Sequence, residues 1–294
     1  MSKPTSSTPT QNLSAALADL AASAAPSVVA IHSGRSRSSG FVWRPGLIVT
    51  ADETLSEEDE FIVTLSGSDT AAAHLVGRDP TTDIALLRVE SDLQPFSLTE
   101  SPMVAGALVV AVGAEEDAST VALGVVSRAS GPWRSLRGGD IDARIELDMR
   151  LRKSAEGGLV LDAGGEAIGM AVFGPRRRVL VIPTATIERI APKLASNGRI
   201  ARGYLGLGLQ PVAIESGEGS GAMVMSVDPQ GPGALAGLHQ GDILVAWNGE
   251  PIRHVHSLLR ALGPDSVGQT VTLRLRRAGD TRQVPLTIAE SPAA

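Results

Sequence analysis

Short apolar runs separated by turn residues fill the first two thirds of the chain. Runs of this length, rich in Val, Ile and Leu, are typical of β-strands. They form two series, at residues 28–31, 40–43, 47–50, 61–65, 74–76 and 84–89, and then at residues 108–112, 121–127, 143–147, 159–161, 167–173 and 179–182. Two series of six strands predict a mainly β domain built as a double β-barrel.

Two stretches with helical spacing flank these strands. Apolar side chains recur every three or four positions from Leu13 to Ala24, with Asn12 as the expected N-cap. The same spacing recurs at residues 184–197 and stops at Gly198, and glycine is a common residue just past a helix. We therefore expect one helix on each side of the barrels.

A second unit begins at Tyr204. Its predicted strands and helices lie at residues 205–209, 222–227, 243–247, 270–274 and 284–288, and near residues 234–237 and 254–262. Asn248-Gly249 predicts a tight hairpin, because both central positions of such a turn need a positive φ. The expected organisation is a flexible tail at 1–12, a first domain at 13–198, a linker at 199–203 and a second domain at 204–291.

Composition limits the function and the location. The net charge of −6 argues against a nucleic-acid binder, which would usually carry a basic surplus. The absence of cysteine excludes disulfides and cysteine nucleophiles. The polar N-terminus and Asp19 do not read as a secretory signal, and the apolar run at 105–114 is about half of a membrane span. We therefore expect a cytoplasmic protein without a membrane span.

Several sequence motifs resemble those of the HtrA (Deg) family. They are GLIVTADETL, VGRDPTTDIALLRVE and SAEGGLVLDAGGEAIGM in the first domain, and RGYLGLGLQ followed by GPGALAGLHQGDILVAWNGEPI in the second. The resemblance covers about nine tenths of the chain. It implies a chymotrypsin-like double six-stranded β-barrel followed by a PDZ domain, a small β-barrel or sandwich with two helices. It also implies a homo-oligomer, because the family commonly forms trimers.

The resemblance places a catalytic triad on three positions of this chain. Glu53 stands where the family has the histidine base, Asp83 stands at the acid and is retained, and Glu156 stands where the family has the serine. A glutamate cannot form a serine acyl-enzyme, and its ordinary pKa lies about two units below that of histidine. These replacements predict a pseudoprotease that is not an enzyme.

The loop around the missing serine departs from the family as well. Ser154 and Ala155 replace the first residues of the family's G-N-S-G-G word, so the oxyanion loop is expected to be degenerate. Ser154 with Lys153 as its base is a remote alternative nucleophile. His32 and His74 are expected to be structural or surface residues, as lone histidines usually are.

Three carboxylates in one cleft need a compensating proton, cation or arginine. The favoured interpretation is that they turn towards water or pair with Arg150, Arg152 or Lys153. A Ca²⁺ or Mg²⁺ site and a glycosidase-type carboxylate pair remain less favoured alternatives. We expect no metal and no cofactor at this site.

The PDZ resemblance implies a binding site for the C-terminal tails of peptides. In such domains a peptide adds as a strand, and its carboxylate lies in a nest of backbone N–H groups. The resemblance places the site at Tyr204, Leu205, Gly206, Leu207, Gly208 and Leu209, with His256, Leu259 and Leu262 on the facing helix. The leucines predict an apolar C-terminal residue in the ligand.

The function expected from these observations is a non-catalytic HtrA-like adaptor, scaffold or chaperone-like assembly factor that binds protein tails. An active endopeptidase or hydrolase with a non-standard site is the alternative. A regulatory subunit of an active HtrA homologue is another.

Overall fold

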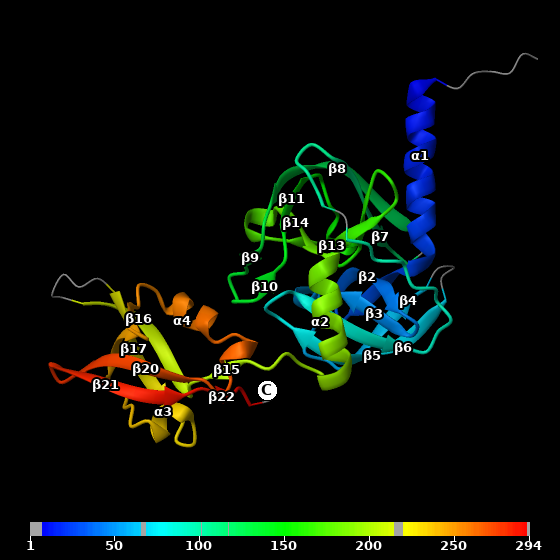
Figure 1. Cartoon of the computed structure of the whole chain (residues 1–294). Coiled ribbons are helices and arrows are strands. Elements are labelled where there is room, and N and C mark those ends of the chain that lie inside the picture. The colour runs from blue at the N-terminus through cyan, green and yellow to red at the C-terminus, as the bar shows by residue number, and fades with distance from the viewer. Residues whose placement is uncertain (1–7, 66–68, 101, 117, 215–219, 293–294) are drawn as a thin grey trace, which may run out of the picture. The chain divides into compact units, whose positions relative to one another are not determined.

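The computed structural model describes residues 8–292 except 66–68, 101, 117 and 215–219. The chain divides into two compact units (Figure 1). The first contains residues up to Trp133 together with Asp140–Arg199, and the second contains Arg134–Gly139 and Ile200–Ala294. Each unit has a core of its own.

The first six strands of unit one form a closed barrel in the order β1-β2-β3-β6-β5-β4. They are β1 (Val28–Ser33), β2 (Ser36–Arg44), β3 (Leu47–Thr50), β4 (Glu60–Thr64), β5 (Thr70–Asp79) and β6 (Ile84–Val89). Ile31, Ile48 and Leu87 are fully buried in its core. Alternating apolar side chains therefore point inwards, as the sequence pattern requires.

The next barrel closes in the order β11-β14-β13-β12-β7-β8. Its strands are β7 (Leu108–Ala114), β8 (Ser119–Ser130), β11 (Arg144–Asp148), β12 (Leu159–Asp162), β13 (Ala167–Phe173) and β14 (Val179–Pro183). The predicted double six-stranded barrel is confirmed. The structure also contains the two-residue strands β9 (Trp133–Arg134) and β10 (Asp140–Ile141), which the pattern of apolar runs did not predict.

Two helices belong to this unit. Helix α1 spans Pro9–Ala24 and therefore starts earlier than expected, with Thr8 rather than Asn12 as its N-cap. The tail expected at residues 1–12 thus includes helical residues, and its first seven residues lie outside the described part of the chain. Helix α2 (Thr184–Asn197) ends at Gly198 with a φ of 71°, as predicted.

The second unit is a sheet in the order β16-β17-β18-β20-β21, with β16 at one edge. Its elements are β15 (Gly203–Tyr204), β16 (Leu207–Ala213), β17 (Ser220–Val227), α3 (Pro232–Leu235), β18 (Ile243–Trp247), β19 (Glu250–Pro251), α4 (Val255–Ala261), η5 (Pro264–Ser266), β20 (Thr270–Arg277), β21 (Asp280–Thr287) and β22 (Ala289–Glu290). Asn248 and Gly249 have φ values of 48° and 88°, so the predicted hairpin is confirmed. Among the described residues, no helix has the length and apolar character that crossing a membrane requires.

Candidate functional site

Three short segments of unit one carry the residues of the expected triad. Glu53 lies in the 3-10 turn η2 (Asp52–Thr54) after β3, Asp83 immediately precedes β6, and Glu156 follows the 3-10 turn η3 (Lys153–Ala155). The backbone N–H of Glu53 donates to Oδ1 of Asp83 at 2.8 Å. Both glutamates lie close enough to Asp83 to raise its pKa through their charges. The structure therefore brings the three carboxyl groups to one site.

Asp83 is the most perturbed group of this site. Burial is the main cause that raises its pKa to about 8, and the charges of Glu53, Glu156 and Asp52 add to the effect. The hydrogen bond from the Glu53 N–H acts in the opposite direction. Asp83 also has a φ of 59°, a left-handed conformation that Asp and Asn tolerate better than most residues. Its carboxyl group therefore keeps its proton to a higher pH than an ordinary aspartic acid does.

Glu156 is held by the backbone rather than by an arginine. Its carboxyl Oε1 accepts the N–H of Phe173 at 3.0 Å, and its exposed fraction is 7%. Burial raises its pKa, and the charge of Glu53 adds to the shift, while Lys153 and Arg177 oppose it. No hydrogen bond or ion pair joins Glu156 to the arginines that the sequence analysis suggested as partners, within the described residues.

Those two arginines have other surroundings. Arg152 makes a long ion pair of 3.5 Å with Glu115. Arg150 is exposed and lines a cavity beside the loop. Pairing of the carboxylates with Arg150 or Arg152 is therefore not found among the described residues, whereas Glu53 is exposed, as the alternative of turning towards water expects. Burial raises the pKa of Asp83 and of Glu156, which reduces the repulsion between the carboxyl groups.

The loop before Glu156 has a tightly turned conformation. The N–H of Glu156 donates to the carbonyl of Lys153 at 3.2 Å, so it is engaged inside the turn rather than free to stabilise an oxyanion. Gly157 follows with a φ of 85°, and a Cβ there would lie 2.2 Å from the carbonyl oxygen of Ser39. Only glycine fits this close approach.

Ser154 and Ala155 have structural roles in this loop. Oγ of Ser154 donates to Glu115 at 2.8 Å, so its proton is engaged by a carboxylate rather than by Lys153, the base of the alternative nucleophile. Its carbonyl accepts the hydroxyl of Ser39 at 2.7 Å. Ala155 is 4% exposed and belongs to the core of the second barrel.

The two histidines of the first barrel lie outside this site. His32 contacts the hydroxyl of Thr64 at 3.1 Å, and His74 lies 3.4 Å from a carboxyl oxygen of Glu60. In the described part of the chain, no group of three or more Asp, Glu or His side chains is arranged to hold a metal ion.

The expected carboxylate loop of the second unit is an ordered turn. Oη of Tyr204 donates to Asp228 at 3.0 Å, and the carbonyl of Gly206 accepts the N–H of the same Asp228 at 2.8 Å. Leu205 is 4% exposed, and its carbonyl accepts the N–H of Gly233 at 2.7 Å. Gly206 has a φ of 67°, and a Cβ there would lie 2.9 Å from Gly231. The carbonyls of Leu205 and Gly206 are thus held by hydrogen bonds within the protein, which fixes the conformation of the turn.

Strand β16 follows this turn and provides the exposed edge. Leu207 and Leu209 are half-buried and pack against the core of the unit, with Gly208 between them. Pro211, further along the strand, has no N–H, so this position cannot donate a main-chain hydrogen bond to a peptide strand. Edge position and turn together form the geometry that peptide addition requires.

The wall of this groove was expected to come from the facing helix. Leu262 lies after α4, is half-buried and packs against the core, as Leu207 and Leu209 do. The side chains of His256 and Leu259 lie outside the described residues. A cavity of about 480 Å³ beside β16 is lined by Leu209 and by residues that the sequence did not predict: Pro211, Val212, Ala213, Ser220, Arg253, His254 and Val255. Four of them lie on β16 and β17, and the other three lie just before α4 or at its first residue, where no apolar periodicity marks them.

Comparisons with known proteins agree with this architecture. Residues 38–170 match the trypsin-like peptidase domain, and residues 203–288 match the PDZ domain. A probable periplasmic serine endoprotease DegP-like of Brucella suis is 31% identical over 272 residues, which are 86% of this chain and 52% of that protein. Its counterpart in Bartonella henselae is 32% identical over 86% of this chain and 52% of that protein. The chain spans about half the length of these curated relatives.

A solved structure extends the comparison to nearly the whole chain. The serine endoprotease from Yersinia pestis has a TM-score of 0.68 and 27% identity, and the match covers 99% of this chain and 100% of that chain. The relatives' names contradict two expectations from the sequence. They are serine endoproteases, which contradicts the expectation of a non-enzyme, and they are periplasmic, which contradicts the expected cytoplasmic location.

Proposed function

Because the chain belongs to the HtrA/DegP family of trypsin-like serine protease domains followed by a PDZ domain, we propose that it is a periplasmic peptide hydrolase with a non-standard, carboxyl-based site. The observation that carries this proposal is the buried carboxyl group of Asp83, which lies beside Glu53 and Glu156 and whose pKa is raised to about 8. Hydrolysis without a serine needs one carboxyl group as acid and another as base, with pKa values that differ.

Glu53 and Asp83 take these two roles. The carboxylate of exposed Glu53 accepts a proton from a water molecule, whose oxygen attacks the carbonyl carbon of the peptide bond. The proton of Asp83 passes to the carbonyl oxygen, so the engaged N–H of Glu156 is not needed for an oxyanion. When the carbon–nitrogen bond breaks, the proton on Glu53 passes to the leaving amine. The hydroxyl proton returns to Asp83 as the new carboxyl group forms.

Digestion of an unfolded protein tests this mechanism. We expect new C-termini that carry oxygen-18 when the digestion is run in labelled water, and loss of at least about a hundredfold in rate for Glu53→Gln or Asp83→Asn. Arg35→Gln, an exposed change in the same barrel, is the matched control. Cleavage that survives both carboxyl variants, or that a serine-directed phosphonate abolishes, would refute the carboxyl mechanism.

The PDZ domain implies peptide binding, and we propose that it takes apolar C-terminal tails. The ordered turn at Leu205-Gly206 and the edge strand β16 support this assignment. Peptides with a free apolar C-terminus should bind in the micromolar range by calorimetry. Equal affinity of the C-terminally amidated peptides would contradict carboxylate recognition.

Self-association is proposed for the first unit, since the family forms oligomers. The exposed apolar residues of this unit include Leu13 of α1 and Leu108 and Leu123 of the β7–β8 pair, each 45% to 50% exposed, which leaves apolar surface for a partner subunit. Light scattering should give a mass above that of the 30.3 kDa chain. A monomer that instead associates with an active homologue would favour the regulatory-subunit alternative.

A further inference from the structure

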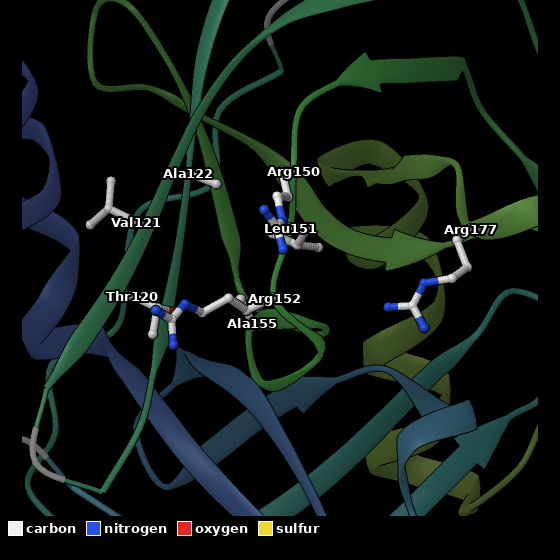
Figure 2. A pocket seen from close by; sticks show the side chains of 8 residues that line it. All are labelled: Thr120, Val121, Ala122, Arg150, Leu151, Arg152, Ala155 and Arg177. Atoms are coloured by element: carbon white, nitrogen blue, oxygen red, sulfur yellow. The ribbon is translucent and has the colours of Figure 1, made fainter.

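An arginine-lined cavity lies beside the loop that carries Glu156. It has a volume of about 570 Å³, and three of its lining residues are Arg150, Arg152 and Arg177 (Figure 2). Arg150 and Arg152 come from the stretch before η3, and Arg177 comes from the 3-10 turn η4 (Pro175–Arg177). No carboxylate is among its described lining residues. The cavity is therefore a concentration of positive charge in a chain with a net charge of −6.

The protein itself neutralises little of this charge. Arg150 has no hydrogen bond or ion pair in the described part of the chain. The ion pair of Arg152 with Glu115 is long, at 3.5 Å, and Arg152 is 71% exposed. Arg177 lies 4.8 Å from the ring centroid of Phe173. A bound anion would relieve the mutual repulsion of these guanidinium groups and accept their hydrogen bonds.

A hydroxyl group in the cavity wall is the second observation. Oγ1 of Thr120 is buried and has no hydrogen-bond partner among the described residues, although Thr120 lines the cavity. Buried hydroxyl groups without a partner are rare in folded proteins and call for an explanation. A ligand oxygen in the cavity would accept this hydroxyl proton.

The backbone of η4 is strained where it presents its arginine. Arg176 and Arg177 have φ values of 59° and 56°, in the left-handed region that costs an ordinary residue free energy. Such strain persists where the surroundings or a function maintain it. In this turn the left-handed conformation places Arg177 at the cavity.

The walls of the cavity indicate what kind of anion it takes. Val121, Ala122 and Leu151 are apolar and match the methylene groups of a side chain. Ala155 also lines it and directly precedes Glu156, so the cavity adjoins the site where peptide is proposed to bind. We propose that it receives an acidic side chain, that of Glu or Asp, of a peptide held in the cleft. This specificity rests on the proposed function of the same site.

Binding of short blocked peptides tests the inference. The probes are acetylated and C-terminally amidated hexapeptides with one central Glu or Gln, since amidation keeps them out of the PDZ carboxylate loop. Fluorescence anisotropy with the full chain should show at least about tenfold tighter binding of the Glu peptide, the range expected for hydrogen bonds to a charged group. The preference should shrink as salt is raised, because the guanidinium groups are exposed.

Substitutions assign the preference to the cavity. Arg150→Gln and Arg177→Gln should each reduce it, and Thr120→Val should reduce it without a change in net charge. Arg176→Gln removes the same charge from the same turn but not from the cavity lining, and should leave it intact. Equal binding of Glu and Gln peptides, or an equal loss in Arg176→Gln, would overturn the inference. Binding of inorganic phosphate to the chain, with no binding of the Glu peptide, would also overturn the inference.

This readout does not depend on hydrolysis. A chain that prefers the Glu peptide but cleaves nothing would retain the cavity's specificity and refute the proposed function. A chain that cleaves peptides through Glu53 and Asp83 without preferring an acidic residue would support the proposed function and overturn the inference about the cavity.

Discussion

Asp83→Asn offers the sharpest test of the protonated carboxyl group. Asparagine resembles a protonated aspartic acid in shape, can still accept the N–H of Glu53 through Oδ1, and tolerates the φ of 59° at this position. The variant should therefore keep the fold while removing the titration. What it changes is the pH dependence of stability.

The direction and size of that change follow from the pKa of Asp83. Its pKa rises from 3.8 to about 8 on folding, so between these values the folded protein holds a proton that the unfolded chain has released. The resulting stability is fully present below pH 3.8 and is lost as the pH rises through about 8. Each unit of pH in this window lowers the free energy of unfolding by about 1.4 kcal/mol. Between about pH 5 and about pH 8 the loss approaches about 4 kcal/mol as an upper bound.

Scanning calorimetry of the whole chain across this range is the assay. Wild type and Asp83→Asn should unfold at similar temperatures near the acid end, and the variant should be the more stable near the alkaline end. Asp69→Asn, an exposed change in the same barrel, should follow the wild type throughout. Parallel curves for wild type and Asp83→Asn would refute the protonated Asp83 and the hydrolysis mechanism with it.

Glu156→Gln extends the same experiment. Glutamine can still accept the N–H of Phe173, but it removes one of the charges that raise the pKa of Asp83. The pH at which stability is lost should therefore move towards acid. An unchanged midpoint would show that Glu156 does not act on Asp83.

Four further substitutions probe the scaffold and the peptide-binding turn. Gly157→Ala places a Cβ 2.2 Å from a backbone oxygen at a φ of 85°, and should destabilise unit one by several kcal/mol, roughly 3 or more, in urea denaturation. Gly206→Ala should weaken peptide binding at least about tenfold in calorimetry. Gly237→Ala, at a similar φ of 75° but with open space around it, should leave binding unchanged. Asp242→Asn leaves Arg277 without its partner at 2.7 Å, and should cost unit two about 3 to 5 kcal/mol in urea.

The sequence predicts the barrels well because their side-chain pattern is local. Strand β6 (Ile84–Val89) has the predicted bounds, since both of its ends coincide with the ends of an apolar run. Strand β8 (Ser119–Ser130) is longer than its apolar run, because main-chain pairing with β7 and β11 continues past the apolar side chains. The start of α1 was missed, although Thr8 and Gln11 form a capping box around Pro9 that the sequence displays.

The carboxyl site was predicted from the sequence only in part. The resemblance to the HtrA family was sufficient to place Glu53, Asp83 and Glu156 at one site, because the positions of barrel loops follow from the strands. It could not identify the partner of Glu156, because that partner is a backbone N–H of Phe173, which any residue type supplies. The position of an individual hydrogen-bond donor is a tertiary property.

The chemistry of the site follows from how its negative charge is neutralised. A cation or an arginine would hold all three carboxylates ionised, whereas a proton on Asp83 leaves an acid beside the exposed carboxylate of Glu53. The three arginines next to the site do not neutralise these carboxylates through direct ion pairs, so their charge remains for a ligand. The separation of the carboxyl groups from the arginines therefore supports both proposals. Asp83, with its raised pKa, supplies the acid for hydrolysis. The arginine-lined cavity supplies the preference for an acidic side chain.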